Sequence, residues 1–126
     1  MQQTVIIADD AQFMRVMLKD ILEDLGFTVI AEAADGHQAV QRYVEHRPDL
    51  ILIDITMPGL DGVAACREIV MRDPDARVVM VSALGQKDAV LEAVRAGAVD
   101  FVIKPFEPER VEETLRKLLA GSALAH

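Results

Sequence analysis

The chain has few aromatic residues: no Trp, one Tyr and four Phe among its 126 residues. A core built around large rings is therefore excluded, and Val, Ile, Leu, Met and Ala must supply the buried surface. Hydrophobic residues make up 52% of the sequence, which excludes a disordered chain. A chain of this length is expected to form one domain around one core.

The sequence has a single cysteine, Cys66, so an intrachain disulfide is excluded and a reducing compartment is indicated. We interpret Cys66 as a small buried residue of a helix. No apolar run has the length of a membrane span. Met1-Gln2-Gln3 leads directly into a predicted strand, which leaves no room for a signal peptide. We therefore expect a cytoplasmic protein that has no membrane contact.

Positive charge is also scarce, with 13 Lys and Arg against 21 Asp and Glu, and the net charge is −8 at pH 7. This excess argues against nucleic acid as a direct partner and fits a cationic ligand or a basic protein partner. The three histidines, His37, His46 and His126, lack metal-ligand spacing and are expected at the surface.

Apolar, β-rich runs alternate five times with helical patterns, which is typical of an α/β protein. The predicted strands cover residues 4–8, 28–33, 50–53, 77–81 and 99–103, and the predicted helices cover 13–25, 37–46, 63–71, 87–96 and 107–120. Continuously apolar strands indicate a parallel sheet covered on both faces, with right-handed crossovers. We expect one domain over residues 1–120 and a frayed tail over residues 121–126.

Helical spacing also predicts which helix residues face the core. It places Met17, Val44 and Val94 inward, in the first, second and fourth helices. Gly26 is predicted to end the first helix, because glycine readily adopts the left-handed conformation found there.

Charged residues follow three of the predicted strands. Asp9 and Asp10 come after the first, Asp54 after the third and Lys104 after the fifth. The carboxyl ends of parallel strands share one edge of a sheet, so three carboxylates and one ammonium group are expected to converge there. Carboxylates that lie close together repel one another and favour a bound cation. Oxygen ligands of this kind suit Mg²⁺ or Mn²⁺, so the arrangement suggests metal-dependent phosphoryl chemistry.

Each of these residues also has a purely structural explanation. Asp is a favoured helix cap, which could account for Asp9, Asp10 or Asp54, and which explains Asp61 well because Asp61-Gly62 leads into a helix. A lone Lys104 is usually a solvated charge, and Ser82 could be a turn hydroxyl. Capping explains one Asp of the pair better than two, however, and leaves Asp54 without a reason to follow a central strand.

Taken together, residues 4–119 resemble the receiver domain of two-component response regulators. The matching residues are Asp9-Asp10, Asp54 within Asp-x-x-Met-Pro-Gly, Ser82-Ala83, Phe101 and Lys104-Pro105-Phe106. The resemblance implies a flavodoxin-like, doubly wound five-stranded parallel sheet of order 2-1-3-4-5 with five helices. Ala8 and Ser82 depart from the commoner Val and Thr, and neither change removes a required functional group.

The resemblance also implies roles for these residues. Asp54 would accept the phosphoryl group of a histidine kinase's phosphohistidine. Mg²⁺ would be bound by Asp10, by the Asp54 carboxylate and by the Thr56 carbonyl, with Asp9 acting mainly through water. Lys104 and Ser82 would hold the phosphoryl oxygens, and Phe101 would change rotamer on activation. The protein would be a switch with autocatalytic phosphorylation and dephosphorylation, not a true enzyme.

More narrowly, the chain resembles the single-domain chemotaxis regulators of this family, in segments 10–15, 82–86 and 96–101. Their implied partners are a chemotaxis histidine kinase, a flagellar motor switch protein and a phosphatase, and the expected state is a monomer or weak dimer.

Three alternatives remain. The chain could be the receiver domain of a larger regulator with an output domain, for example one that binds DNA. A flavodoxin-like nucleotide-binding module is disfavoured, because Asp9 and Asp10 would repel a phosphate and no glycine-rich fingerprint is present. A phosphatase with an aspartyl nucleophile would usually need a cap or an insertion, and the chain has no spare length for one.

Overall fold

A computed structural model describes residues 3–124, and describes side chains for residues 3–118. Five parallel strands form one sheet in the order β2-β1-β3-β4-β5, as the resemblance implied. The strands are β1 (Thr4–Ala8), β2 (Thr28–Ala33), β3 (Leu50–Asp54), β4 (Val78–Ser82) and β5 (Asp100–Ile103). The helices are α1 (Gln12–Asp24), α2 (Gly36–His46), α3 (Gly62–Arg72), α4 (Lys87–Arg95) and α5 (Pro108–Leu124).

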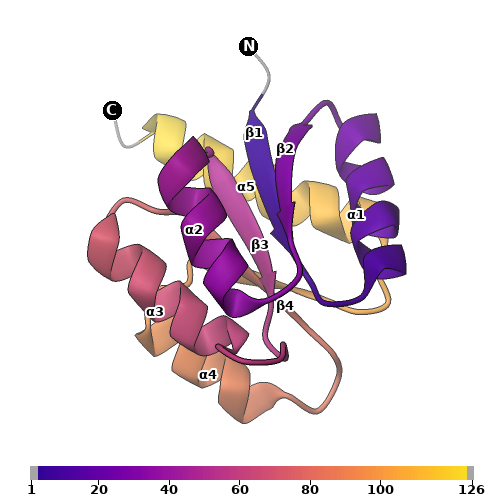
Figure 1. Cartoon of the computed structure of the whole chain (residues 1–126). Helices are drawn as coiled ribbons and strands as arrows, with labels where there is room; N and C mark the ends of the chain where they lie inside the picture. Colours follow the sequence, from indigo (N-terminus) through magenta and orange to yellow (C-terminus); the bar gives the residue numbers. More distant parts are fainter. Residues whose placement is uncertain (1–2, 125–126) are drawn as a thin grey trace.

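The sheet is covered on both faces, which explains why its strands are continuously apolar. Helices α1 and α5 lie on one side, and α2, α3 and α4 lie on the other (Figure 1). Every residue of the central strands β3 and β4 is buried. Each face has its own core cluster: Val5, Ile7, Leu18, Leu22, Val111 and Leu115 on the first, and Ile6, Ile51, Ala39, Tyr43, Cys66, Ile69 and Ala93 on the second.

The predicted elements agree with the structure except at their ends. Most bounds differ by one or two residues, as is usual where helices and strands fray. The exception is α5, which continues to Leu124 and does not end at Ala120. Gly and Ser lower helix stability only modestly, so 121–122 do not stop the helix. Residues 125–126 of the predicted tail lie outside the described residues.

Several local predictions about single residues can also be compared with the structure. Gly26 follows the end of α1 with φ +94°, as predicted for a glycine at that place. Cys66 is buried in α3, and burial raises the pKa of its thiol to about 11. His37 and His46 are exposed, and His126 lies outside the described residues.

The predicted inward positions were wrong at the margins of three helices. The exposed fractions are 43% for Met17, 41% for Val44 and 52% for Val94. Each lies at the border of its helix's apolar stripe, and residues such as Leu18, Val40 and Ala93 occupy the centre. The periodic pattern thus identified the buried face but overestimated its width.

Strand β2, at one edge of the sheet, contains a bulge. Its register with β1 shifts between Val5 and Ile6, so Val5 pairs with Val29 whereas Ile6 pairs with Ala31. Ile30 is the extra residue, and Ile30 and Ala31 both pack against the α2–α3–α4 side of the sheet.

Candidate functional site

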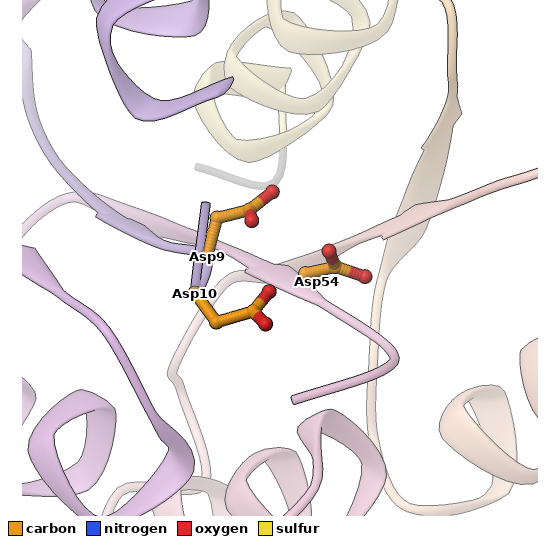
Figure 2. Close-up of side chains that lie close together, drawn as sticks. All are labelled: Asp9, Asp10 and Asp54. Atoms are coloured by element: carbon orange, nitrogen blue, oxygen red, sulfur yellow. The ribbon is translucent and has the colours of Figure 1, made fainter. Parts of the chain in front are cut away.

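Three carboxylates meet at the carboxyl edge of the sheet (Figure 2). Asp9 and Asp10 follow β1, and Asp54 ends β3, the neighbouring strand. One carboxylate oxygen from each residue lies within 4.8 Å of the other two. Asp9 and Asp54 are only 4% and 6% exposed, whereas Asp10 is exposed. Two of the three negative charges are therefore largely removed from water.

Lys104 provides the nearest positive charge. Its Nζ lies 2.8 Å from Asp54 Oδ2 and 3.3 Å from Asp9 Oδ2, and its side chain is 23% exposed. Burial by itself would lower the pKa of Lys104. The hydrogen bonds and negative charges of Asp54 and Asp9 raise this pKa by more than burial lowers it, so it lies above its usual value. The ammonium group is therefore charged at neutral pH. The Lys104–Pro105 peptide bond is cis.

Backbone amides bind the other oxygens of the two buried carboxylates. The Thr56 N–H donates to Asp54 Oδ1 at 3.0 Å, and the Ala11 N–H donates to Asp9 Oδ1 at 2.9 Å. Neither Asp9 nor Asp10 caps α1, because its N-cap is Ala11, which makes no side-chain cap bond. Capping is thus excluded as the reason for this acidic pair.

Other aspartates show what a capping role looks like in this chain. Asp61 accepts a hydrogen bond from the Ala64 N–H at 2.9 Å as the N-cap of α3, which confirms its structural interpretation. Asp35 caps α2 in the same way, accepting from the Gln38 N–H at 2.8 Å.

The backbone of Asp54 is fixed by the start of α3. The Gly62 N–H donates to the Ile55 carbonyl at 2.9 Å, and a Cβ at Gly62 would overlap the Asp54 carbonyl oxygen. Only glycine permits this approach, so α3 packs directly against the backbone that carries the Asp54 carboxylate.

Ser82 and Phe101 lie beside this acidic edge. Ser82 ends β4, is 2% exposed, and accepts the Lys104 N–H at its carbonyl at 2.8 Å. Phe101 lies on the edge strand β5 and is 40% exposed. A cavity of about 340 Å³ separates them, and its lining includes Ser82, Gln86, Val90 and Phe101.

Two polar side chains at this edge were not identified from the sequence. Arg15 donates to the Asp9 carbonyl and pairs through Nε with Glu32 at 3.0 Å. Gln86 accepts from the Ala83 N–H at 2.6 Å and donates to Thr56 Oγ1 at 2.9 Å. No spacing rule selects these residues, because their roles depend on the path of long side chains between loops.

The donor set fits a hard divalent cation. Three carboxylates face one ammonium group, which leaves an excess of negative charge at the site. Oxygen ligands and one solvent-facing residue, Asp10, match the preference of Mg²⁺ for carboxylates combined with waters. Thr56, whose carbonyl was predicted as a further ligand, is exposed in the loop that follows Asp54.

None of the helices in residues 3–124 is long and apolar enough to cross a membrane.

Residues 5–116 match the family described as the response regulator receiver domain. The chemotaxis protein CheY of Bacillus subtilis is 52% identical over 119 residues, covering 94% of this chain and 99% of that protein. CheY of Thermotoga maritima is 49% identical over 118 residues, covering 94% and 98%. Among solved structures, the CheX–CheY–BeF3–Mg²⁺ complex of Borrelia burgdorferi contains a chain with a TM-score of 0.88 and 36% identity, with 93% and 89% of the two chains covered.

Proposed function

Because this chain belongs to the response regulator receiver family, we propose that Asp54 is the residue that accepts a phosphoryl group from a histidine kinase. The chain is a phosphoacceptor response regulator of the chemotaxis type, and the CheY proteins it resembles are matched over almost their whole length. The observation that carries the proposal is the buried Asp54 carboxylate, held 2.8 Å from the Lys104 ammonium beside two further carboxylates.

The proposed transfer is a displacement at phosphorus. A carboxylate oxygen of Asp54 attacks the phosphohistidine phosphorus, the new O–P bond forms as the N–P bond breaks, and the imidazole nitrogen leaves with the electron pair. Asp54 is placed for this role because α3 and the Thr56 amide fix its backbone and one of its oxygens. Hydrolysis of the resulting acyl phosphate returns the carboxylate and inorganic phosphate, so the chain acts as a self-resetting switch.

The remaining site residues balance charge during this step. Lys104 holds a phosphoryl oxygen through its ammonium group, and the Ser82 hydroxyl donates to another. Asp9, Asp10, Asp54 and the Thr56 carbonyl are the groups that would hold Mg²⁺. When bound, Mg²⁺ supplies positive charge that offsets the charge of the phosphoryl oxygens.

The proposed output surface is formed by α4, β5 and α5, with Phe101 as its mobile residue. Drawing the Ser82 hydroxyl towards the phosphoryl group moves the β4–α4 loop, and the ring of Phe101 then turns into the adjacent cavity. The proposed partners are a chemotaxis histidine kinase, a flagellar motor switch protein that binds this surface, and a phosphatase. The similar CheY of Borrelia burgdorferi has been crystallised in a complex with CheX, which supports a protein partner for this chain.

Intact mass spectrometry tests the phosphoacceptor. The protein is incubated with Mg²⁺ and a small-molecule phosphodonor, and we expect a gain of one phosphoryl group. Asp54→Asn should abolish this gain, and so should a chelator. Asp61→Asn is the matched control, since Asp61 caps a helix at the same edge, and it should be phosphorylated like the wild type. Labelling of Asp54→Asn would refute the assignment.

A peptide titration tests the partner surface. A fluorescent peptide from a flagellar motor switch protein should bind the phosphorylated form about 5–150-fold more tightly than the free form, the usual range of allosteric coupling. Ser82→Ala should reduce this ratio and leave phosphorylation possible. Equal affinities would count against the chemotaxis role, and amide shifts confined to α1 and α2 would refute the proposed surface.

A further inference from the structure

Gln86 joins the two loops on either side of Asp54. Its Oε1 accepts a hydrogen bond from the Ala83 N–H at 2.6 Å, and its Nε2 donates to Thr56 Oγ1 at 2.9 Å. Thr56 belongs to the β3–α3 loop and Ala83 to the β4–α4 loop. Both ends of the Gln86 amide are therefore used to tie one loop to the other, and we call this pair of hydrogen bonds the Gln86 bridge.

The Gln86 bridge closes a ring of contacts around the Asp54 carboxylate. On one side, the Thr56 N–H donates to Asp54 Oδ1 at 3.0 Å. On the other, the Lys104 ammonium binds Asp54 Oδ2 at 2.8 Å, and the Lys104 N–H donates to the Ser82 carbonyl at 2.8 Å. Ser82 precedes Ala83, which completes the ring. A change at either oxygen of Asp54 thus acts on a connected set of hydrogen bonds.

Gln86 also fixes the point where α4 begins. It is the residue before Lys87, the first residue of α4, but its side chain does not cap that helix. The three residues between Ser82 and Gln86 are exposed, and Gly85 has φ +89°. An exposed loop with a glycine hinge has little packing to hold it, so the Gln86 bridge is a main restraint on the start of α4.

We propose that Gln86 is a positioning residue that keeps the β4–α4 loop in its unswitched place until Asp54 is phosphorylated. The inference rests on the proposed function, since it assigns the residue that sets the resting balance of that switch. When the β4–α4 loop moves towards Asp54, the distance between Thr56 and Ala83 changes. One glutamine side chain can no longer reach both residues, so the Gln86 bridge opens. A hydrogen bond made in only one of two states biases the equilibrium towards that state.

NMR of the amides of α4 and β5 measures this balance in the whole protein. Wild type is recorded free and with Mg²⁺ and beryllofluoride, a phosphoryl mimic, and the shift of each amide between these two spectra gives the direction of the switch. The free spectra of Gln86→Ala, Gln86→Asn and Thr56→Val are then placed between them. Gln86→Asn keeps the amide group on a shorter side chain. It therefore tests whether the length of the side chain is needed as well as its hydrogen-bonding groups.

We expect each variant to raise the ratio of switched to unswitched protein by about two- to tenfold, the factor that follows from losing one hydrogen bond. Gln86→Ala and Thr56→Val both remove the same contact, so the double variant should match Gln86→Ala alone. The matched control is Gln38→Ala. Gln38 accepts from the Ala34 N–H at 2.9 Å in another loop at this edge, and its loss should leave the ratio unchanged.

The outcomes separate the two proposals. If wild type does not respond to Mg²⁺ and beryllofluoride, the proposed function fails, and the role of Gln86 fails with it. If wild type responds but the Gln86 and Thr56 variants remain at the free position, the role of Gln86 alone is refuted. Additive effects in the double variant, or an equal shift in Gln38→Ala, would also overturn it, because they would indicate general loosening of the loops.

Discussion

The three aspartates at the acidic edge differ in the groups that stabilise their negative charge. Asp54 and Asp9 each accept a backbone N–H and share the Lys104 ammonium. Asp10 has the same carboxylate but is exposed, and it does not cap the helix that follows it, whose N-cap is Ala11. In the absence of a cation, Asp10 therefore contributes repulsion to its neighbours and no capping stabilisation.

Asp10→Ala is expected to raise thermal stability in chelator and to weaken Mg²⁺ binding. Removing one of three crowded carboxylates relieves repulsion of about 1 kcal/mol or more for two charges roughly 4 Å apart. Thermal unfolding with and without Mg²⁺ measures both effects. A lower melting temperature in chelator would show that Asp10 stabilises the fold by a contact that outweighs the repulsion.

Far from this site, a hydrogen bond and an ion pair join α2 to the end of α3. The Tyr43 hydroxyl donates to Asp73 Oδ2 at 2.7 Å, and Arg47 lies 3.3 Å from the same oxygen. The hydrogen bond from Tyr43 lowers the pKa of Asp73 below its usual value, although burial acts in the opposite direction. Burial and this hydrogen bond raise the pKa of Tyr43.

Tyr43→Phe should lower the free energy of unfolding at pH 7 by about 1–2 kcal/mol, since it removes a hydrogen bond to a charged group. A lowered folded-state pKa means that the unfolded chain binds protons more tightly. The contribution of Asp73 is thus present above its unfolded pKa, near 3.8, and is lost as the pH falls through the folded value.

Urea unfolding of both proteins between pH 7 and pH 3 tests this pH dependence. The difference between wild type and Tyr43→Phe should shrink below about pH 4. In an Asp73→Asn background, the cost of Tyr43→Phe should not vary with pH. A cost that stays constant from pH 7 to pH 3 in the wild-type background would show that Asp73 does not supply the dependence.

At the scale of secondary-structure elements, the start of α3 is the most constrained junction of the site. Gly62 packs against the Asp54 backbone at a distance that excludes any side chain. Helix α3 thus fixes the Asp54 backbone by direct contact, whereas an exposed loop and the Gln86 bridge connect α4 to the same site. The two helices differ in how freely they can respond to a change at Asp54.

Gly62→Ala is expected to reduce stability by about 1–3 kcal/mol, as overpacking usually does, and to slow phosphorylation because Asp54 must shift. Gly26→Ala is the control. Gly26 has φ +94° but open space around it, so alanine there adds backbone strain far from the site. Denaturant unfolding and the rate of mass gain measure the two effects. Equal phosphorylation rates in the two variants would show that Gly62 does not position Asp54.

Much of this arrangement of elements was predictable. Alternating apolar runs and helical patterns identified all ten elements, because parallel strands are buried on both faces. The strand order came from the resemblance and not from the pattern. Asp9, Asp54 and Lys104 could be predicted to converge because each follows a strand. Arg15 and Gln86 could not, since they reach the site by side-chain paths that spacing along the chain does not encode.

At the scale of the whole molecule, the net charge of −8 adds a general repulsion to the local one. Monovalent salt screens both, whereas a cation bound at the acidic edge also gains direct contacts. The two effects can therefore be separated by comparing ions at equal ionic strength.

Mg²⁺ should raise the melting temperature more than NaCl of the same ionic strength. At ten times its dissociation constant, a ligand that binds only the folded state adds about 1.4 kcal/mol, or roughly 3–5 °C for a domain of this size. Asp10→Ala should lose most of the specific part of this increase, and Asp75→Ala, at an exposed aspartate in the loop after α3, should retain it. Identical increases with the two salts would refute a specific site among these carboxylates.

The bulge in β2 has a consequence for how the chain tolerates changes in length. Strand residues normally alternate between the two faces of a sheet, but Ile30 and Ala31 both face α2 and α3. The later residues of β2 therefore face the opposite side from the one that strict alternation would give them. This arrangement directs Glu32 towards Arg15 on α1 and buries Ala33 on the opposite face. Deleting Ile30 would restore strict alternation and leave both residues on their present faces. Deleting Glu32 would not, because Ala33 would then move to the face that Glu32 now occupies, so the loss of one residue is best accommodated at the bulge.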